Sequence, residues 1–224
     1  MKRINSLIGA GLLVLLAVAS SHAAVIFATN PTGVEWAQSG NPVTLGTSFT
    51  VGASPISITS LGYFDQTGAG LNFNHQVGIY SLSQALLGSV NVASGTETTY
   101  HDGTRWMTLG VPINLDPNTQ YLLAFTMTSV GDPSNVAAPG AVTINPAFAL
   151  SGNGYTYAWG GTLAFPATEA VDGLYAFGGN MMADVPEPSP MMEVPEPSQA
   201  VAIGIMLLTF TGYRFHRSRR PQAA

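Results

Sequence analysis

Side chains that could carry out chemistry are few and scattered in this sequence of 224 residues. It has no cysteine, which excludes disulfides, thiolate catalysis and Cys-ligated zinc. It also has no Gly-x-Ser-x-Gly elbow, His-Glu-x-x-His pair, phosphate-binding loop, dinucleotide-binding glycine run or EF-hand-like spacing. The sequence therefore has no motif typical of a familiar reaction class. We predict a protein that is not an enzyme and needs no cofactor.

Histidines and aspartates of the central region would serve a metal only if the fold brought them together. His75 and His101 are too few for a His-rich site, and we interpret both as surface loop or turn residues. Calcium takes six to eight oxygen ligands, whereas the aspartates occur singly, so we interpret them as solvated turn residues. These aspartates are Asp65, Asp102, Asp116, Asp132 and Asp172. We predict no metal site.

Aromatic residues are the remaining candidates for a binding site. Tyr155, Tyr157 and Trp159 alternate along one expected strand, so they share a face at intervals of about 7 Å. Such a row could stack on sugar rings. The competing interpretation is core packing, because large aromatic side chains supply much of the buried area of a β-sandwich. Trp36, Trp106 and Tyr63 could also contribute to stacking on sugar rings.

Short β-branched and aromatic runs, separated by Gly, Pro, Asn and Asp, predict the elements that must position these residues. Residues 121–128 alternate between two faces, as in a half-buried strand. No helix of useful length is indicated between 25 and 182. About nine strands at this spacing predict an all-β domain over 24–183, a two-sheet β-sandwich or jelly roll. The expected strands are Val43–Val51, Ile56–Phe64, Gln76–Ser81, Leu86–Ala93, Arg105–Leu109, Thr119–Thr128, Ala141–Leu150, Tyr155–Phe165 and Leu174–Met181.

Local patterns predict where these strands bend and end. The apolar alternation of 56–63 changes phase at Ser60, which predicts a β-bulge. Asp102-Gly103 is typical of a hairpin turn that needs positive φ. Asp116-Pro117-Asn118 and Asp132-Pro133-Ser134 are turn sequences as well.

Charge is divided into three blocks along the sequence. Residues 24–198 contain all twelve acidic residues and one basic residue, Arg105, for a net charge of −11. A body of this kind offers no cationic surface to a phosphate backbone, so we predict no nucleic-acid partner. The remaining basic residues lie at the two ends of the sequence.

Each end carries an apolar run next to basic residues. Lys2 and Arg3, the apolar run 7–19 and Ser21-His22-Ala23 predict a secretory signal peptide over 1–23, cleaved between Ala23 and Ala24. Near the C-terminus, we predict a short transmembrane helix at about 199–213, with the body outside the inner membrane. By the positive-inside rule, the cluster that follows stays in the cytoplasm: Arg214, Arg217, Arg219 and Arg220.

A proline-rich linker over 184–198 joins the body to this helix. Its five prolines predict an extended, polyproline-like segment without helix or sheet. Val-Pro-Glu-Pro-Ser occurs in it twice, at Val185–Ser189 and at Val194–Ser198. The second copy, the short apolar helix and the arginine cluster together, over 194–220, resemble the PEP-CTERM protein-sorting signal of Gram-negative bacteria.

This resemblance implies a route through the cell. The chain would be exported by the secretion machinery, cut by signal peptidase, and held briefly in the inner membrane. An exosortase-type transpeptidase would then read Val194, Pro195, Glu196, Pro197 and Ser198. It would remove the helix and arginines near Pro195–Pro197, and the doubled motif leaves the cut between the two copies open. Family members are associated with exopolysaccharide, the cell surface and the biofilm matrix.

The body carries a second resemblance. Leu-Gly-Tyr-Phe-Asp, His-Gln-Val-Gly-Ile-Tyr and Leu-Asp-Pro-Asn-Thr-Gln-Tyr, within Leu61–Thr126, are similar to an uncharacterised β-sandwich domain of secreted bacterial proteins. We therefore expect an exported, non-catalytic surface or matrix protein. The alternative is a carbohydrate-binding module that holds exopolysaccharide through its aromatic residues. A third alternative is an unrecognised secreted hydrolase, which would need two acids about 5–10 Å apart.

Overall fold

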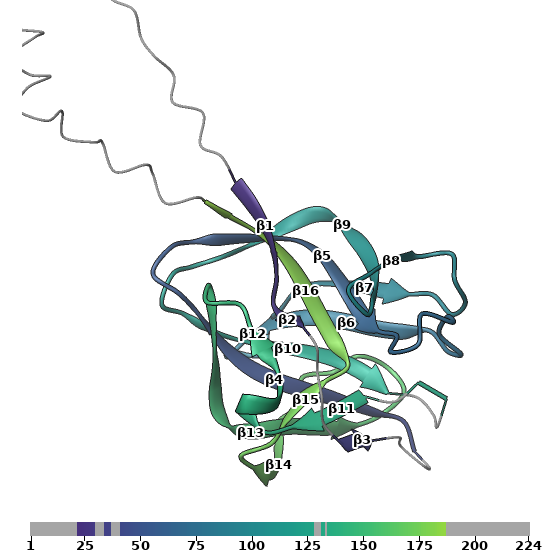
Figure 1. Ribbon diagram of the computed structural model, residues 1–224. Helices are drawn as coiled ribbons and strands as arrows, with labels where there is room; N and C mark the ends of the chain where they lie inside the picture. Colours follow the sequence, from purple (N-terminus) through teal and green to yellow (C-terminus); the bar gives the residue numbers. More distant parts are fainter. Residues whose placement is uncertain (1–21, 30–33, 37–40, 128–130, 133, 187–224) are drawn as a thin grey trace, which may run out of the picture. The chain divides into compact units, whose positions relative to one another are not determined.

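The computed structural model describes residues 22–29, 34–36, 41–127, 131–132 and 134–186 (Figure 1). These residues form sixteen strands and one short 3₁₀ turn, Pro139–Ala141, which confirms the all-β, sandwich-like fold. None of the described helical segments has the length and apolar character needed to cross a membrane. The signal peptide up to residue 21, the second Val-Pro-Glu-Pro-Ser copy, the helix at 199–213 and the arginine cluster lie outside the described residues.

Two principal sheets make up the sandwich. One has the strand order β1-β16-β5-β9-β8 and the other β14-β13-β4-β10-β6-β7, while β15-β11-β3 and β12-β2 form two small sheets. All the pairings are antiparallel. The strands are β1 (His22–Ile26), β2 (Ala28–Thr29), β3 (Val34–Trp36), β4 (Val43–Val51), β5 (Ile56–Phe64), β6 (His75–Ser81), β7 (Leu86–Val92), β8 (Thr99–His101), β9 (Thr104–Leu115), β10 (Gln120–Met127), β11 (Ser134–Ala137), β12 (Thr143–Ile144), β13 (Phe148–Trp159), β14 (Thr168–Asp172), β15 (Tyr175–Phe177) and β16 (Gly179–Pro186).

A single main core forms between the two sheets. Alternate residues of β4 and β5 point into it, because successive side chains of a strand leave opposite faces. Aromatic rings fill its centre: the ring centroids of Phe27 and Phe148 are 5.3 Å apart in an edge-to-face contact. Tyr63, Phe49 and Phe125 are also fully buried. Burial of these side chains is the main stabilising contribution to the fold.

A smaller apolar cluster covers the outer face of the six-stranded sheet. Tyr80, Leu122 and Ala124 are buried there against Leu163 and Phe165 of the segment after β13. The strand β10 is consequently buried on both faces, not half-buried as its alternation predicted. The alternation is real, but the covering segment follows β13 in the sequence, and no pattern within 121–128 indicates it.

The predicted bulge and two of the predicted turns are confirmed, whereas in the third, Asp132-Pro133-Ser134, Ser134 begins β11 and Pro133 lies outside the described residues. The pairing of β5 with β9 shifts register between Ile58 and Ser60, where a bulge was expected. Asp102 (φ 48°) and Gly103 (φ 72°) form the turn between β8 and β9, as a type I′ hairpin requires. Asn118 (φ 54°) occupies the turn between β9 and β10.

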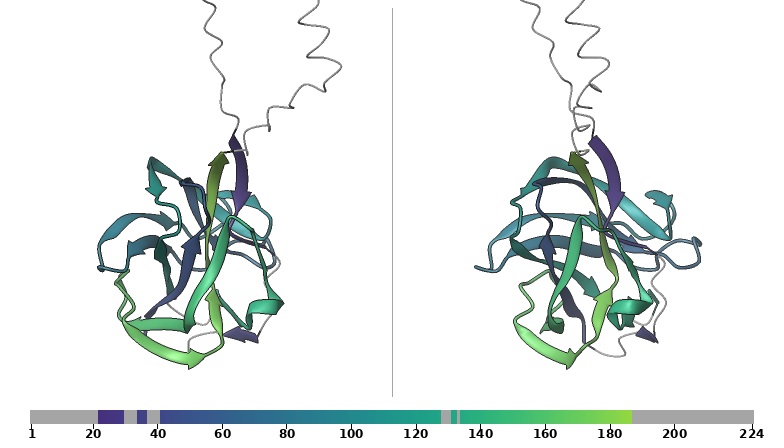
Figure 2. Two further views of the ribbon diagram at one scale, coloured as in Figure 1. Left: turned by 90° about the vertical axis from the view of Figure 1, so that its left-hand side faces the viewer. Right: turned by 60° about the vertical axis from the view of Figure 1, so that its left-hand side comes forward.

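The strands β1 and β16 pair side by side and carry the two ends of the described chain (Figure 2). Ala24 lies opposite Asp184, and Ala23 lies opposite Val185. The strand β16 therefore continues to Pro186, although no sheet was expected from 184 onward. Pro186 is tolerated because it is the last residue of the strand, beyond the residues that pair with β5.

Candidate functional site

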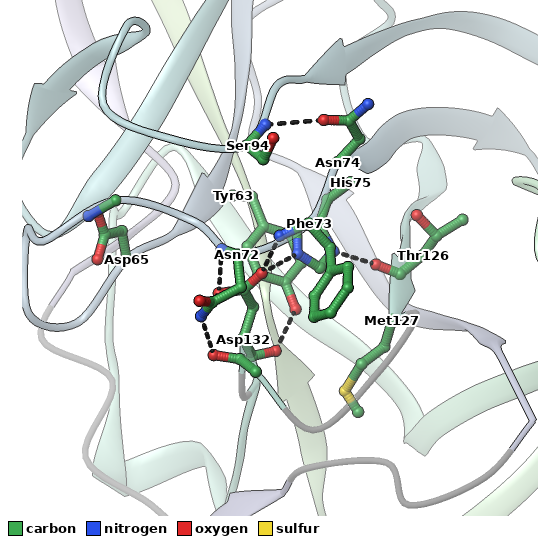
Figure 3. Close-up of polar contacts among 12 residues, drawn as sticks. Tyr63, Asp65, Asn72, Phe73, Asn74, His75, Ser94, Thr126, Met127 and Asp132 are labelled. Carbon is green, nitrogen blue, oxygen red and sulfur yellow. Dashed lines mark hydrogen bonds and ion pairs between the residues drawn. The ribbon is translucent and has the colours of Figure 1, made fainter.

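The strongest concentration of polar interactions in the described residues surrounds a buried histidine, His75, the first residue of β6 (Figure 3). Its side chain is 0% exposed. Its Nδ1 lies 2.8 Å from the carbonyl oxygen of Thr126 in β10, and its Nε2 lies 3.0 Å from the Oδ2 of Asp132. This histidine therefore joins the start of β6 to the end of β10 and to the segment that precedes β11.

Asp132 accepts hydrogen bonds at both carboxylate oxygens. Its Oδ1 accepts from the backbone and side-chain amides of Asn72 at 2.8 and 3.0 Å, and its Oδ2 accepts from the backbone N–H of Phe73 at 2.7 Å. Burial raises the pKa of Asp132, but the hydrogen bonds from His75, Asn72 and Phe73 outweigh it and lower the pKa below its ordinary value. The carboxylate is thus ionised, and both ring nitrogens of His75 face acceptors.

Tyr63 of β5 closes this cluster from the side of the five-stranded sheet. Its ring stacks on that of His75, with centroids 3.7 Å apart and an angle of 11° between the planes. Its hydroxyl donates to the backbone carbonyl of Asp132 at 3.2 Å. Burial, followed by the charge of Asp132, raises the pKa of the Tyr63 phenol far above its ordinary value. Tyr63 therefore stays neutral and acts as a packing residue with one satisfied hydroxyl.

A buried ion pair lies nearby, between Arg105 of β9 and Asp65. The guanidinium Nε donates to Asp65 Oδ2 at 2.8 Å, and the side chains are 5% and 4% exposed. The other guanidinium nitrogens donate to the carbonyl oxygens of Thr96, Thr98 and Gly68 at 2.8–3.1 Å. Asp65 also accepts from the backbone N–H groups of Gly68 and Gly70, both at 3.0 Å. Arg105 thereby fixes two loops that follow different strands.

Three residues expected at the surface are therefore interior residues. His75, Asp65 and Asp132 were interpreted as solvated loop or turn residues, and this was wrong, because each is buried and fully paired. The alternation of side chains along β6 does indicate that His75 is buried, because His75 shares a face of the strand with the buried Val77 and Ile79. The pairing itself joins residues 57 positions apart, which no local pattern indicates.

A hollow of about 340 Å³ lies beside these carboxylates. Asp65 and Asp132 line it, together with Asn72 and Gly131. Their carboxylate oxygens already accept N–H donors of the protein. In the described part of the chain, no three His, Cys, Asp or Glu side chains are grouped as metal ligands would be. These carboxylates therefore bond to groups of the protein itself and stabilise the fold.

The predicted aromatic row lies on β13. Tyr155, Tyr157 and Trp159 pair with Thr47, Leu45 and Val43 of β4, so they share the sheet face that forms the core. Tyr155 and Tyr157 are half-buried against that core, whereas Trp159, at the strand end, is 62% exposed. The rings of Tyr157 and Trp159 meet edge to face at 5.7 Å. Only the Trp159 end of the row is open to a ligand.

The other aromatic candidates are separated in the structure. Tyr63 is fully buried and Trp106 is 6% exposed, while Trp36 ends β3. The remaining polar candidates are also dispersed. His101 and Asp102 are exposed at the β8–β9 turn and form a pair at 3.2 Å. Asp116 is exposed after β9, and Asp172 ends β14.

Fold and site together define a β-sandwich domain whose buried polar groups hold its loops. A family model described as "Domain of unknown function (DUF4082)" matches residues 28–177. The chain belongs to this family. No curated protein matches the sequence.

Among solved structures, the chain is similar to one titled "Crystal structure of infectious bursal disease virus VP2 subviral particle". The sequence identity is 14% and the TM-score 0.25. The similarity covers 90% of this chain and 54% of the viral chain, so the chain spans about half of that protein's length.

Proposed function

We propose that this protein is an exported, non-catalytic component of the cell surface or exopolysaccharide matrix, sorted by an exosortase-type transpeptidase. The supporting observation is the pairing of β1 with β16, which brings both ends of the described domain to the same end of the sandwich. The signal peptide and the sorting region would both join the domain there. The opposite end of the sandwich and the open part of the outer face of the five-stranded sheet would be free for contacts with the matrix.

The interior chemistry supports a non-catalytic role. The carboxylate of Asp132 and the guanidinium of Arg105 are bonded to backbone groups of the surrounding loops. A general acid or base must lie within hydrogen-bond reach of a substrate. The imidazole of His75 is fully buried and both of its nitrogens are bonded, so it has no such reach.

Intact mass of the mature protein tests this proposal. The chain is purified from its native host and from a strain that lacks the sorting peptidase. We expect loss of the residues after about 195–197 only where the peptidase is present. A mass that ends at Ala224 in both strains would contradict the proposal, because the chain would then keep its C-terminal segment permanently.

A second candidate function is binding of polysaccharide at the end of the aromatic row. The observation that favours it is the exposure of Trp159 beside Tyr157. An exposed indole supplies a flat apolar surface on which a sugar ring can stack. The substitution Trp159→Ala removes that surface, and we include it below as a comparison variant.

A further inference from the structure

The outer face of the five-stranded sheet carries two aligned rows of side chains. Thr99, Trp106 and Gly62 are partners in neighbouring strands, and so are Thr108, Ser60 and Met182. Directly opposed residues of antiparallel strands share a face. The core residues Leu61 and Met181 alternate with these positions, so both rows face away from the core.

One end of this face is covered and the other is open. At the covered end, Asn180 donates from Nδ2 to the carbonyl oxygen of Ala28 at 2.8 Å, and its Oδ1 accepts from Ala28 N–H at 3.2 Å. The buried Asn180 side chain fills that end of the face and joins it to β2, which follows β1 along β16. At the open end is a groove of about 390 Å³, within the range of about 300–1,000 Å³ typical of ligand pockets. The residues that line it are Ser60, Thr99, Tyr100, His101, Trp106, Thr108 and Met182.

Trp106 forms a fixed part of this groove. Its indole N–H donates to the carbonyl oxygen of His101 at 3.0 Å, which sets the orientation of the ring. The ring lies over Gly62, where an added Cβ would come 2.8 Å from its Cε3. Glycine at this position therefore lets the indole lie close to the sheet. A rigid ring loses little conformational entropy when a ligand binds.

The exposed lining is mostly apolar, with a few hydroxyls and one imidazole, and it lacks carboxylates and permanent cations. It offers hydroxyls from Ser60, Thr99 and Thr108, the His101 imidazole, and apolar surface from Tyr100 and Met182, with only a small exposed part of Trp106. Hydroxyls both donate and accept hydrogen bonds. A phosphate or a metal ion would find no charged partner there. A sugar ring, with an apolar face and a rim of hydroxyls, fits this chemistry.

We propose that this groove binds a sugar residue of an uncharged polysaccharide. The site is separate from the aromatic row, because Trp106 lies in the five-stranded sheet and Trp159 in the six-stranded one. It does not depend on the sorting route, so sugar binding and C-terminal processing can each fail without the other.

Affinity electrophoresis of the full-length protein, in a mild zwitterionic detergent, tests the groove. The gels contain dextran, β-1,3-glucan, galactomannan or xyloglucan. We expect at least one of them to retard the protein. The double variant Thr99→Val/Thr108→Val keeps the side-chain shape and loses two hydroxyls that can bond to a sugar, so we expect about tenfold or greater weakening. His101→Ala is a second variant, and weakening is expected there too.

Matched controls keep the outcomes separate. Thr143→Val removes a hydroxyl at an exposed position of β12, outside the groove, and should leave retardation unchanged. Trp159→Ala should also leave it unchanged. Two results would overturn the proposal: no retardation by any of the four glycans, or equal retardation of the wild type and both groove variants. Loss of binding in Trp159→Ala alone would assign the sugar to the aromatic row instead.

Discussion

Asp132 joins more separate parts of the fold than its position before a short strand suggests. It accepts from the loop that precedes β6, through Asn72 and Phe73, and from His75 at the start of that strand. Its backbone carbonyl accepts from Tyr63 of the opposite sheet. Removing an acceptor of several buried hydrogen bonds leaves their donors without a partner. This carboxylate is therefore a structural residue whose ionisation contributes to stability.

We predict that Asp132→Asn lowers the free energy of unfolding at pH 7 by about 1–3 kcal/mol, because buried donors lose an acceptor. The folded-state pKa of Asp132 is lowered, whereas the unfolded chain titrates near the ordinary value of about 3.9. The stabilisation is therefore fully present above about pH 4 and is lost as the pH falls through the lower folded value. Urea denaturation at pH 7 and pH 3 measures this.

The gap in unfolding free energy between wild type and Asp132→Asn should accordingly narrow at pH 3. Asp102→Asn is the matched control, because Asp102 is 53% exposed and its pair with His101 is solvated. We expect it to change the unfolding free energy by less than about 1 kcal/mol. A gap of the same size at both pH values would show that ionisation of Asp132 does not stabilise the fold.

Sequence patterns could place these residues on a face but could not give them partners. Arg105 shares a face of β9 with Met107 and Leu109, which pack against the core. The alternation of side chains along the strand therefore predicts that Arg105 points inward. Its partner Asp65 lies forty positions earlier, at the end of another strand. Contacts between residues so far apart in the sequence depend on sheet order and loop geometry, and hydrophobic periodicity predicts neither.

At the scale of elements, strands with clear alternation were predicted best. Both β4 and β5 have the predicted bounds, since apolar residues repeat every second position along β4 and on either side of the bulge in β5, between turn-forming residues. The longest strands were predicted less well. The strand β9 continues to Leu115, beyond the predicted end at Leu109, and β13 spans Gly152 and Gly154. Glycine and proline were interpreted as boundaries there, but pairing with a long neighbour overrides local propensity.

The strand β16 also includes part of a processing motif. Val185 and Pro186 belong to the first Val-Pro-Glu-Pro-Ser copy, and Val185 packs against the main core. Cleavage between Ala23 and Ala24 would remove the partner of Val185 in β1 but leave the pairs from Ala24 to Ile26. A peptidase that reads extended chain would therefore meet a folded strand at the first copy.

We predict that C-terminal processing depends on the second copy alone. The variant Pro195→Ala/Pro197→Ala should keep the full C-terminal mass in the native host. The matched variant Pro186→Ala/Pro188→Ala should be processed like the wild type, because its first change lies in the sheet and alanine is compatible with a strand. Intact mass spectrometry distinguishes the two. Loss of processing in the Pro186→Ala/Pro188→Ala variant would mean that the first copy is the one recognised.

At the scale of the whole molecule, charge limits which partners the domain can hold. Arg105 is the one basic residue of residues 24–198, and the ion pair with Asp65 already neutralises it. The exposed carboxylates are spread over several loops and strands. They include Glu97, Asp102, Asp116 and Glu169. An anionic polysaccharide would therefore meet a surface of its own sign, without an available cation to bind it.

We predict that the protein binds an acidic polysaccharide only when divalent cations bridge the two. Calcium accepts oxygen ligands from different chains in flexible geometry, so scattered carboxylates suffice for bridging. In alginate-containing gels, millimolar calcium should retard the protein, and a chelator should restore its mobility. High salt should weaken the effect, because exposed charges are screened. Dextran gels serve as the control, where calcium should change nothing. Retardation by alginate that is insensitive to chelator and salt would contradict bridging and indicate direct recognition of the sugar.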